Sequence, residues 1–80
     1  MKAHVWVMPK QTVLDPQGKT IHNALASMGF SAVSSVRQGK LFVLDLEGMS
    51  REEAQKQVER ISRDVLANLV IEDYRFEIVE

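Results

Sequence analysis

The sequence has no cysteine, only two histidines and no surplus of positive charge. The absence of cysteine excludes a disulfide framework. The net charge of −1 provides neither a basic field for a nucleic-acid backbone nor a polybasic run for an anionic membrane. We therefore expect no nucleic-acid partner and no membrane partner.

Long apolar runs are also lacking. No stretch approaches the ~20 apolar residues of a membrane-spanning helix. The first ten residues, "MKAHVWVMPK", contain too short an apolar run for a secretory signal peptide. We expect a cytoplasmic protein.

The chain is short enough for one domain only, residues 1–80. A domain of this size buries roughly 60 to 65% of the surface of its unfolded chain, which makes its core marginal. Small domains recover stability from disulfides, metals or oligomerisation. Without cysteines or clustered histidines, oligomerisation is the remaining route.

The first half of the sequence predicts a strand, a helix and a second strand. Lys2–Met8 alternates in the manner of a strand. Asp15 is a good N-cap for a helix over Pro16–Met28, with proline at its first position, and Gly29 stands where a left-handed C-cap residue belongs. Ala32–Gln38 is a weaker strand, with its valines on opposite faces.

The second half predicts a strand, a helix and a final strand. Gly39 is expected to supply a positive φ for a hairpin turn before a strand over Lys40–Glu47. Ser50 and Glu53 form a capping box for a helix that continues to Val65 and breaks near Asn68. A last strand begins at about residue 72.

The order β-α-β-β-α-β is that of the α+β ferredoxin-like sandwich. In this fold two helices cover one face of a four-stranded antiparallel sheet, and the first and third strands are central. Both of these strands carry apolar residues on both faces, so an apolar patch remains on the open face. We expect this patch to be the oligomer face, and it consists of Trp6, Met8, Leu41 and Val43.

No motif for catalysis or metal binding is present: there is no nucleophile pattern, metal-ligand spacing or phosphate loop. His4 and His22 fit ordinary surface histidines better than ligands or bases. An RNA-recognition domain would need aromatic residues on its open sheet face and basic flanks, which this chain lacks. A small regulatory domain that binds a ligand at a dimer interface remains the alternative function.

Three stretches together resemble one protein family: "LDPQGKTIHNALASMGF", "VSSVRQGK" and "VLANLVIEDYRFEIVE". These stretches and the total length of the chain are similar to those of PurS, the small subunit of phosphoribosylformylglycinamidine synthase. The likeness covers nearly the whole chain, and none of its motifs is catalytic. Leu69 stands where that family commonly has proline.

The resemblance implies an accessory subunit of an amidotransferase in purine biosynthesis. It implies a dimer or tetramer that joins a glutaminase (PurQ-type) subunit to a synthetase (PurL-type) subunit, which uses ATP and magnesium. No cofactor or metal is expected on this chain, and no catalytic residue. The candidate docking residues are Asp15, Pro16, Gln17, Gly18, Arg37, Gly39, Lys40, Asn68, Glu72, Asp73 and Tyr74.

Overall fold

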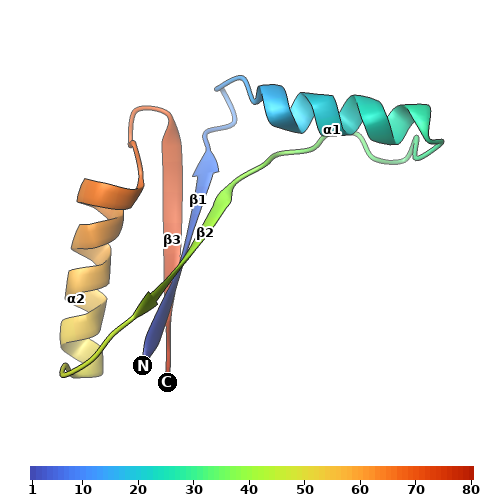
Figure 1. Cartoon of the computed structure of the whole chain (residues 1–80). Coiled ribbons are helices and arrows are strands. Elements are labelled where there is room, and N and C mark those ends of the chain that lie inside the picture. The colour runs from blue at the N-terminus through green and yellow to red at the C-terminus, as the bar shows by residue number, and fades with distance from the viewer.

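The computed structural model describes all 80 residues. Its elements are β1 (Lys2–Pro9), α1 (Pro16–Ser27), β2 (Lys40–Asp45), α2 (Arg51–Ile61), the π-helical turn η1 (Ser62–Leu66) and β3 (Glu72–Val79). The strands form one antiparallel sheet in the order β2-β1-β3. Figure 1 shows α2 beside this sheet and α1 extending away from one end of it.

The strand register divides the side chains between two faces of the sheet. Val5 lies opposite Phe42 of β2 and Phe76 of β3, and all three are on the face toward α2. One residue further, Trp6 lies opposite Leu41 and Arg75 on the other face. The two-residue period of a strand thus produces the separation that the sequence predicted.

The core is small and lies between the sheet and α2. Its six buried apolar side chains come from the central strand, α2 and β3: Ala3, Val5, Val7, Ala54, Val58 and Ile78. Larger side chains, including Phe42, Leu44 and Phe76, pack around this cluster and remain partly exposed. Alanine and valine thus supply most of the fully buried surface.

The N-cap at Ser50, one half of the capping box predicted for the second helix, is confirmed. The Ser50 side chain accepts a hydrogen bond from the backbone N–H of Glu53 at 3.2 Å. After Ile61 the winding loosens into η1, where the Ala67 N–H donates to the carbonyl of Ser62 at 2.9 Å. The predicted helix therefore has the expected extent, but its last turn is π-helical.

The predicted strand over Ala32–Gln38 is wrong, and so are the hairpin at Gly39 and the four-stranded sheet. This segment runs beside α1 because its backbone groups are bound there. Nε2 of His22 donates to the Val33 carbonyl at 2.9 Å, and the Gln38 N–H donates to Asp15 at 2.7 Å. As a result β2, which was expected to be central, is an edge strand.

The expectation that both helices cover the sheet is also wrong. We call residues 10–39, which contain α1, the arm. The arm leaves the sheet after β1 and returns to it at β2, so α1 covers none of the three strands (Figure 1). Gly29, with φ of 93°, ends α1 in the left-handed conformation that the sequence predicted. The molecule is consequently elongated, with extents of 50 × 26 × 14 Å.

Candidate docking site at one end of the sheet

The three predicted docking segments come together at the end of the sheet from which the arm projects. We call these segments, residues 15–18, 37–40 and 68–74, the loop cluster. They are far apart in the sequence, but hydrogen bonds and ion pairs connect them through the end of β1. Three independent candidates therefore form one surface.

Asp15 connects the start of α1 to the returning chain. One carboxylate oxygen accepts the Gly18 N–H at 2.9 Å, and the other accepts the Gln38 N–H at 2.7 Å. These backbone hydrogen bonds, from Gln38 first and Gly18 second, lower the pKa of Asp15, and the nearby positive charge of Arg37 lowers it further. The N-cap predicted from the sequence thus also fixes the position of a distant segment.

Two side chains extend this connection. The Gln38 side-chain amide donates to Oε1 of Gln17 at 2.7 Å. The Arg37 guanidinium donates to the backbone carbonyl of Pro9 at 3.1 Å and also to that of Lys10. The Lys10 N–H in turn donates to the carbonyl of Ile71 at 2.9 Å. Both ends of the arm are therefore fastened to each other and to the loop before β3.

Two glycines permit the close approach of these segments. A Cβ added at Gly18 would lie 2.6 Å from Oδ2 of Asp15 and even closer to the carbonyl oxygen of Val36. A Cβ added at Gly39 would lie 2.6 Å from the carbonyl oxygen of Val7. Gly39 does not have the positive φ that we predicted. It is needed because there is no space for a side chain.

The loop before β3 is held by its own side chains. The Asn68 carbonyl accepts the N–H groups of Ile71 at 3.0 Å and Glu72 at 2.7 Å, and its side-chain oxygen accepts the Val70 N–H at 3.1 Å. The Glu72 carboxylate in turn accepts a hydrogen bond from the Asn68 N–H at 2.8 Å. The loop at Leu69 is thus ordered by asparagine and glutamate without a proline.

Charged side chains form the outer rim of the loop cluster. Lys40 lies 3.9 Å from Glu72, and Lys10 lies 3.7 Å from Asp73. The exposed Lys10–Asp73 pair contributes about 0 to 1 kcal/mol, so the fold does not depend on it. The Glu72 side chain, in contrast, is only 16% exposed and also accepts the Asn68 N–H, so of the second pair Lys40 is the exposed member.

Tyr74 points toward α2 and supports the cluster from the core side. Its hydroxyl donates to a carboxylate oxygen of Glu59. This hydrogen bond is the main reason that the pKa of Tyr74 is raised above 10.0. Tyr74 therefore lies further from the docking surface than the sequence suggested.

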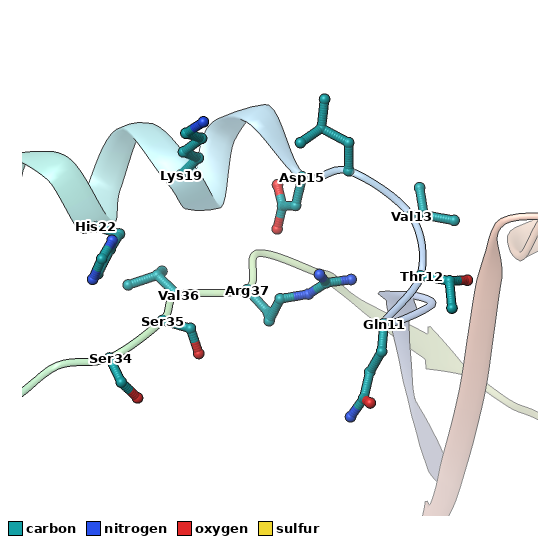
Figure 2. Close-up of a pocket in the computed structure, with 11 residues that line it drawn as sticks. Gln11, Thr12, Val13, Asp15, Lys19, His22, Ser34, Ser35, Val36 and Arg37 are labelled. Atoms are coloured by element: carbon teal, nitrogen blue, oxygen red, sulfur yellow. The ribbon is translucent and has the colours of Figure 1, made fainter.

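An open cavity of about 460 Å³ lies between α1 and the two ends of the arm. Figure 2 shows Arg37 extending toward the loop of Gln11 and Thr12, with Asp15 close to it, and Lys19 pointing away from Arg37. The basic groups do not converge on one point, so the cavity has no anion-binding geometry.

The predicted oligomer residues all lie on the face opposite α2. Met8, Leu41 and Val43 are 39%, 54% and 52% exposed, and Trp6 lies between them on the central strand. The Arg75 guanidinium stacks 4.0 Å above the Trp6 ring. We call this set the open sheet face.

Sequence reasoning missed two residues of these surfaces, Lys10 and Arg75, and it included Gln38 only as part of the segment 37–40, without its contacts to Asp15 and Gln17. Arg75 alternates with the apolar residues of β3, a signal that places it on the open sheet face, but its stacking on Trp6 depends on the β1–β3 register. Lys10 and Gln38 act partly through backbone groups, for which the sequence gives no signal.

The side chains of the chain offer little for catalysis. No group of three histidine or carboxylate side chains lies close enough together to hold a metal ion. No helix is long and apolar enough to cross a membrane. What the arrangement provides is a fixed loop surface and an exposed apolar sheet face, both suited to binding proteins.

Comparison with known proteins agrees with this description. Residues 2–80 match the family model PurS, described as phosphoribosylformylglycinamidine (FGAM) synthase. The phosphoribosylformylglycinamidine synthase subunit PurS of Bacillus subtilis is 43% identical over 79 residues, which are 99% of this chain and 93% of that protein. The corresponding subunit of Methanocaldococcus jannaschii is 38% identical over 96% of this chain and 93% of that protein.

Solved structures show the same fold. A crystal structure of Bacillus subtilis PurS superposes with a TM-score of 0.85 at 43% identity, over 99% of this chain and 98% of that chain. A chain in the structure of PurLQS from Thermotoga maritima superposes with a TM-score of 0.87 at 29% identity, over 98% and 95% of the two chains. The departures from a ferredoxin-like sandwich are therefore compatible with a fold that its relatives share.

Proposed function

This chain belongs to the PurS family, and from that premise we propose that it is the accessory subunit of a phosphoribosylformylglycinamidine synthase complex. In this proposal a PurQ-type glutaminase releases ammonia. A PurL-type synthetase, which holds ATP and magnesium, uses that ammonia to convert formylglycinamide ribonucleotide to formylglycinamidine ribonucleotide. The chain itself carries no cofactor and joins the two enzymes. We propose the cytoplasm as its location, which such a role in purine biosynthesis supports.

The observation that carries the proposal is the match over nearly the whole chain to a protein seen within PurLQS. A match limited to the strands would have included neither the arm nor most of the loop cluster. Here all of the candidate docking segments lie inside the matched residues 2–80.

The loop cluster supports a docking role because it is already ordered. The Asp15 and Arg37 side chains bind backbone groups of distant segments. The Asn68 side chain binds a backbone group of its own loop. A surface fixed in advance loses little conformational entropy on binding. We propose that it contacts one of the two enzymes through its charged rim.

The open sheet face supports self-association. Trp6 and Val43 are apolar, and charges of both signs lie around them on the same face: Lys2, Asp45, Asp73, Arg75 and Glu77. A two-fold axis brings such a surface against itself, so that each charge can meet its opposite. We propose a second copy of the chain as the occupant of this face.

The test is reconstitution of glutamine-dependent ligase activity from the three purified subunits. Omission of this chain should abolish most of the activity. Lys40→Glu should require about a tenfold higher concentration of this chain for half-maximal activity, because it reverses a charge on the rim of the loop cluster. Lys56→Glu, a matched reversal on the exposed side of α2, should behave as wild type.

Full activity without this chain would refute the accessory role. The alternative, a regulatory ligand-binding domain, predicts a different result: small metabolites should raise the melting temperature of the isolated chain. Ligand-dependent melting together with unaltered ligase activity would favour that alternative.

A further inference from the structure

We propose that an apolar tip at one end of the molecule inserts into an apolar recess of the same enzyme that contacts the loop cluster. The tip consists of Val65, in η1, and of Leu69, Val70 and Ile71, in the turn before β3. This inference rests on the proposed function, and it adds to the charged rim the apolar groups that carry the affinity. None of these four residues is among the docking candidates that the sequence predicted.

The first observation is the exposure of these side chains. Val65 is 75% exposed and Val70 81% exposed, and Leu69 and Ile71 are exposed as well. Aliphatic residues of this size are usually buried, and four exposed ones within residues 65–71 indicate a patch rather than a scatter of single side chains. Figure 1 shows the connection from α2 to β3 at the end of the sheet from which the arm leaves. The tip therefore lies beside the loop cluster, to which three of its residues belong.

The second observation is the winding that exposes Val65. In an α-helix, residue 65 lies seven positions after Val58 and therefore on the same face, toward the core. The π-helical turn η1 contains more residues per turn, so that Leu66 packs against the core instead and Val65 faces solvent. In the same turn Ser62 is fully buried, and its hydroxyl has no hydrogen-bond partner. The turn thus combines an exposed valine with a buried serine, the reverse of what stability favours, and π-helical turns are frequent at functional sites.

The third observation is that the turn before β3 is ordered without the help of its aliphatic side chains. The side-chain oxygen of Asn68 accepts the Val70 N–H, and the Asn68 carbonyl accepts the Ile71 N–H. The Ile71 carbonyl accepts the Lys10 N–H at 2.9 Å. Because these hydrogen bonds fix the backbone, the Leu69 and Val70 side chains are held in solvent on an ordered turn. This order lowers the entropy cost of inserting them into a partner.

The charges around the tip favour a protein with an apolar recess as its occupant. Asp64 pairs with Arg63 at 3.1 Å, and Asp73 pairs with Lys10 at 3.7 Å. These charges are thus compensated within the chain, and the tip presents no surplus of positive charge to an anionic membrane. An apolar centre surrounded by a polar rim is the usual anatomy of a protein interface.

The position of the tip indicates which protein it meets. All four residues precede β3 and none belongs to a strand, so a second copy seated on the open sheet face leaves them exposed. Ile71 is the chain neighbour of Glu72, which pairs with Lys40 on the rim of the loop cluster. A protein that contacts this rim reaches the tip as well. The tip and the rim thus belong to one interface.

Binding of this chain to the purified glutaminase and to the purified synthetase, each measured separately, tests the proposal. The tip variant, Val65→Gln with Val70→Gln, should raise the Kd for one enzyme at least tenfold, because two exposed valines lose their apolar contacts. Val65→Ile with Val70→Ile is the matched control, which keeps the apolar surface and should bind like wild type. Lys40→Glu should weaken binding to the same enzyme and not to the other. The tip variant should melt near the wild-type temperature, because both valines are exposed.

Two results would overturn the tip and leave the accessory role intact. One is an unchanged Kd of the tip variant for both enzymes, together with an unchanged concentration for half-maximal ligase activity in the mixture of three subunits. The other is weakening by the tip variant at one enzyme and by Lys40→Glu at the other. A wild-type chain that binds neither enzyme and does not stimulate the ligase refutes the proposed function itself.

Two further measurements test the other possible occupants. Sedimentation of the isolated tip variant should give the wild-type oligomer, and a smaller oligomer would assign the tip to a second copy. The wild-type chain should not float with vesicles of phosphatidylglycerol and phosphatidylethanolamine. Flotation that is lost in the tip variant would assign the tip to a membrane. Either of these assignments overturns the proposal.

Discussion

Gly18→Ala provides a sharp test of the contact between α1 and the returning chain. Gly18 lies in the first turn of α1 and is buried. By helix propensity alone, alanine at a helical position should stabilise the protein by about 1 kcal/mol. The structure predicts the opposite result, because the added methyl group would collide with the carbonyl oxygen of Val36 and with the Asp15 carboxylate.

The magnitude follows from these two opposing effects. Overpacking costs about 1 to 3 kcal/mol, and the upper part of this range applies here because one of the two colliding atoms belongs to the backbone. After subtraction of the propensity gain, a net loss of about 2 kcal/mol remains. For a domain of this size that loss lowers the melting temperature by roughly 8 to 16 °C.

The assay is thermal unfolding followed by circular dichroism at one fixed protein concentration, because the stability of an oligomer depends on concentration. Asn23→Ala is the control: it is exposed on the same helix and should gain about 0.5 kcal/mol from propensity alone. If Gly18→Ala melts at or above the wild-type temperature while the control behaves as expected, residues 36–38 do not lie against α1 in solution.

Three further predictions concern the open sheet face, the titrating groups and the core. Trp6→Glu with Val43→Lys should dissociate the contacts made by the open sheet face, and sedimentation at micromolar concentration measures the loss. The stability that Asp15 contributes through its lowered pKa is present above its ordinary value of 3.8 and is lost as the pH falls through the folded pKa, so urea unfolding of Asp15→Asn should depend less on pH in this range. Val58→Ala should cost about 2 kcal/mol, seen as a lower urea midpoint, because it leaves a cavity in a core of only six side chains.

The features that depend on local sequence were predictable. The caps at Asp15 and Ser50 follow from side chains three residues or fewer from the groups they bind. Val5 and Trp6 lie on opposite faces of the sheet because successive side chains alternate along β1. The PurS resemblance, which covers nearly the whole chain, was confirmed by the family model over residues 2–80 and by the similar subunit of Bacillus subtilis.

The features that depend on long-range contacts were not predictable. Residues 32–38 have the composition of a weak strand, but His22 and Asp15 bind their backbone groups beside α1 instead. The same hydrogen bonds keep α1 off the sheet and make β2 an edge strand. The sequence also did not indicate that the docking segments come together, because this depends on the pairing of the end of β1 with the start of β3. Which of their residues touch another protein stays a prediction.

The fastening of the two ends of the arm has a topological consequence. β1 and β2 are antiparallel neighbours, and Val7 pairs with Lys40 close to the ends of both strands. The first half of the chain is therefore a β-hairpin whose connection has been lengthened to roughly 30 residues. Lengthening a four-residue connection to this extent costs only about 1.8 kcal/mol of closure entropy. The arm can consequently extend far from the sheet at little cost in closure entropy and without a change in the strand register.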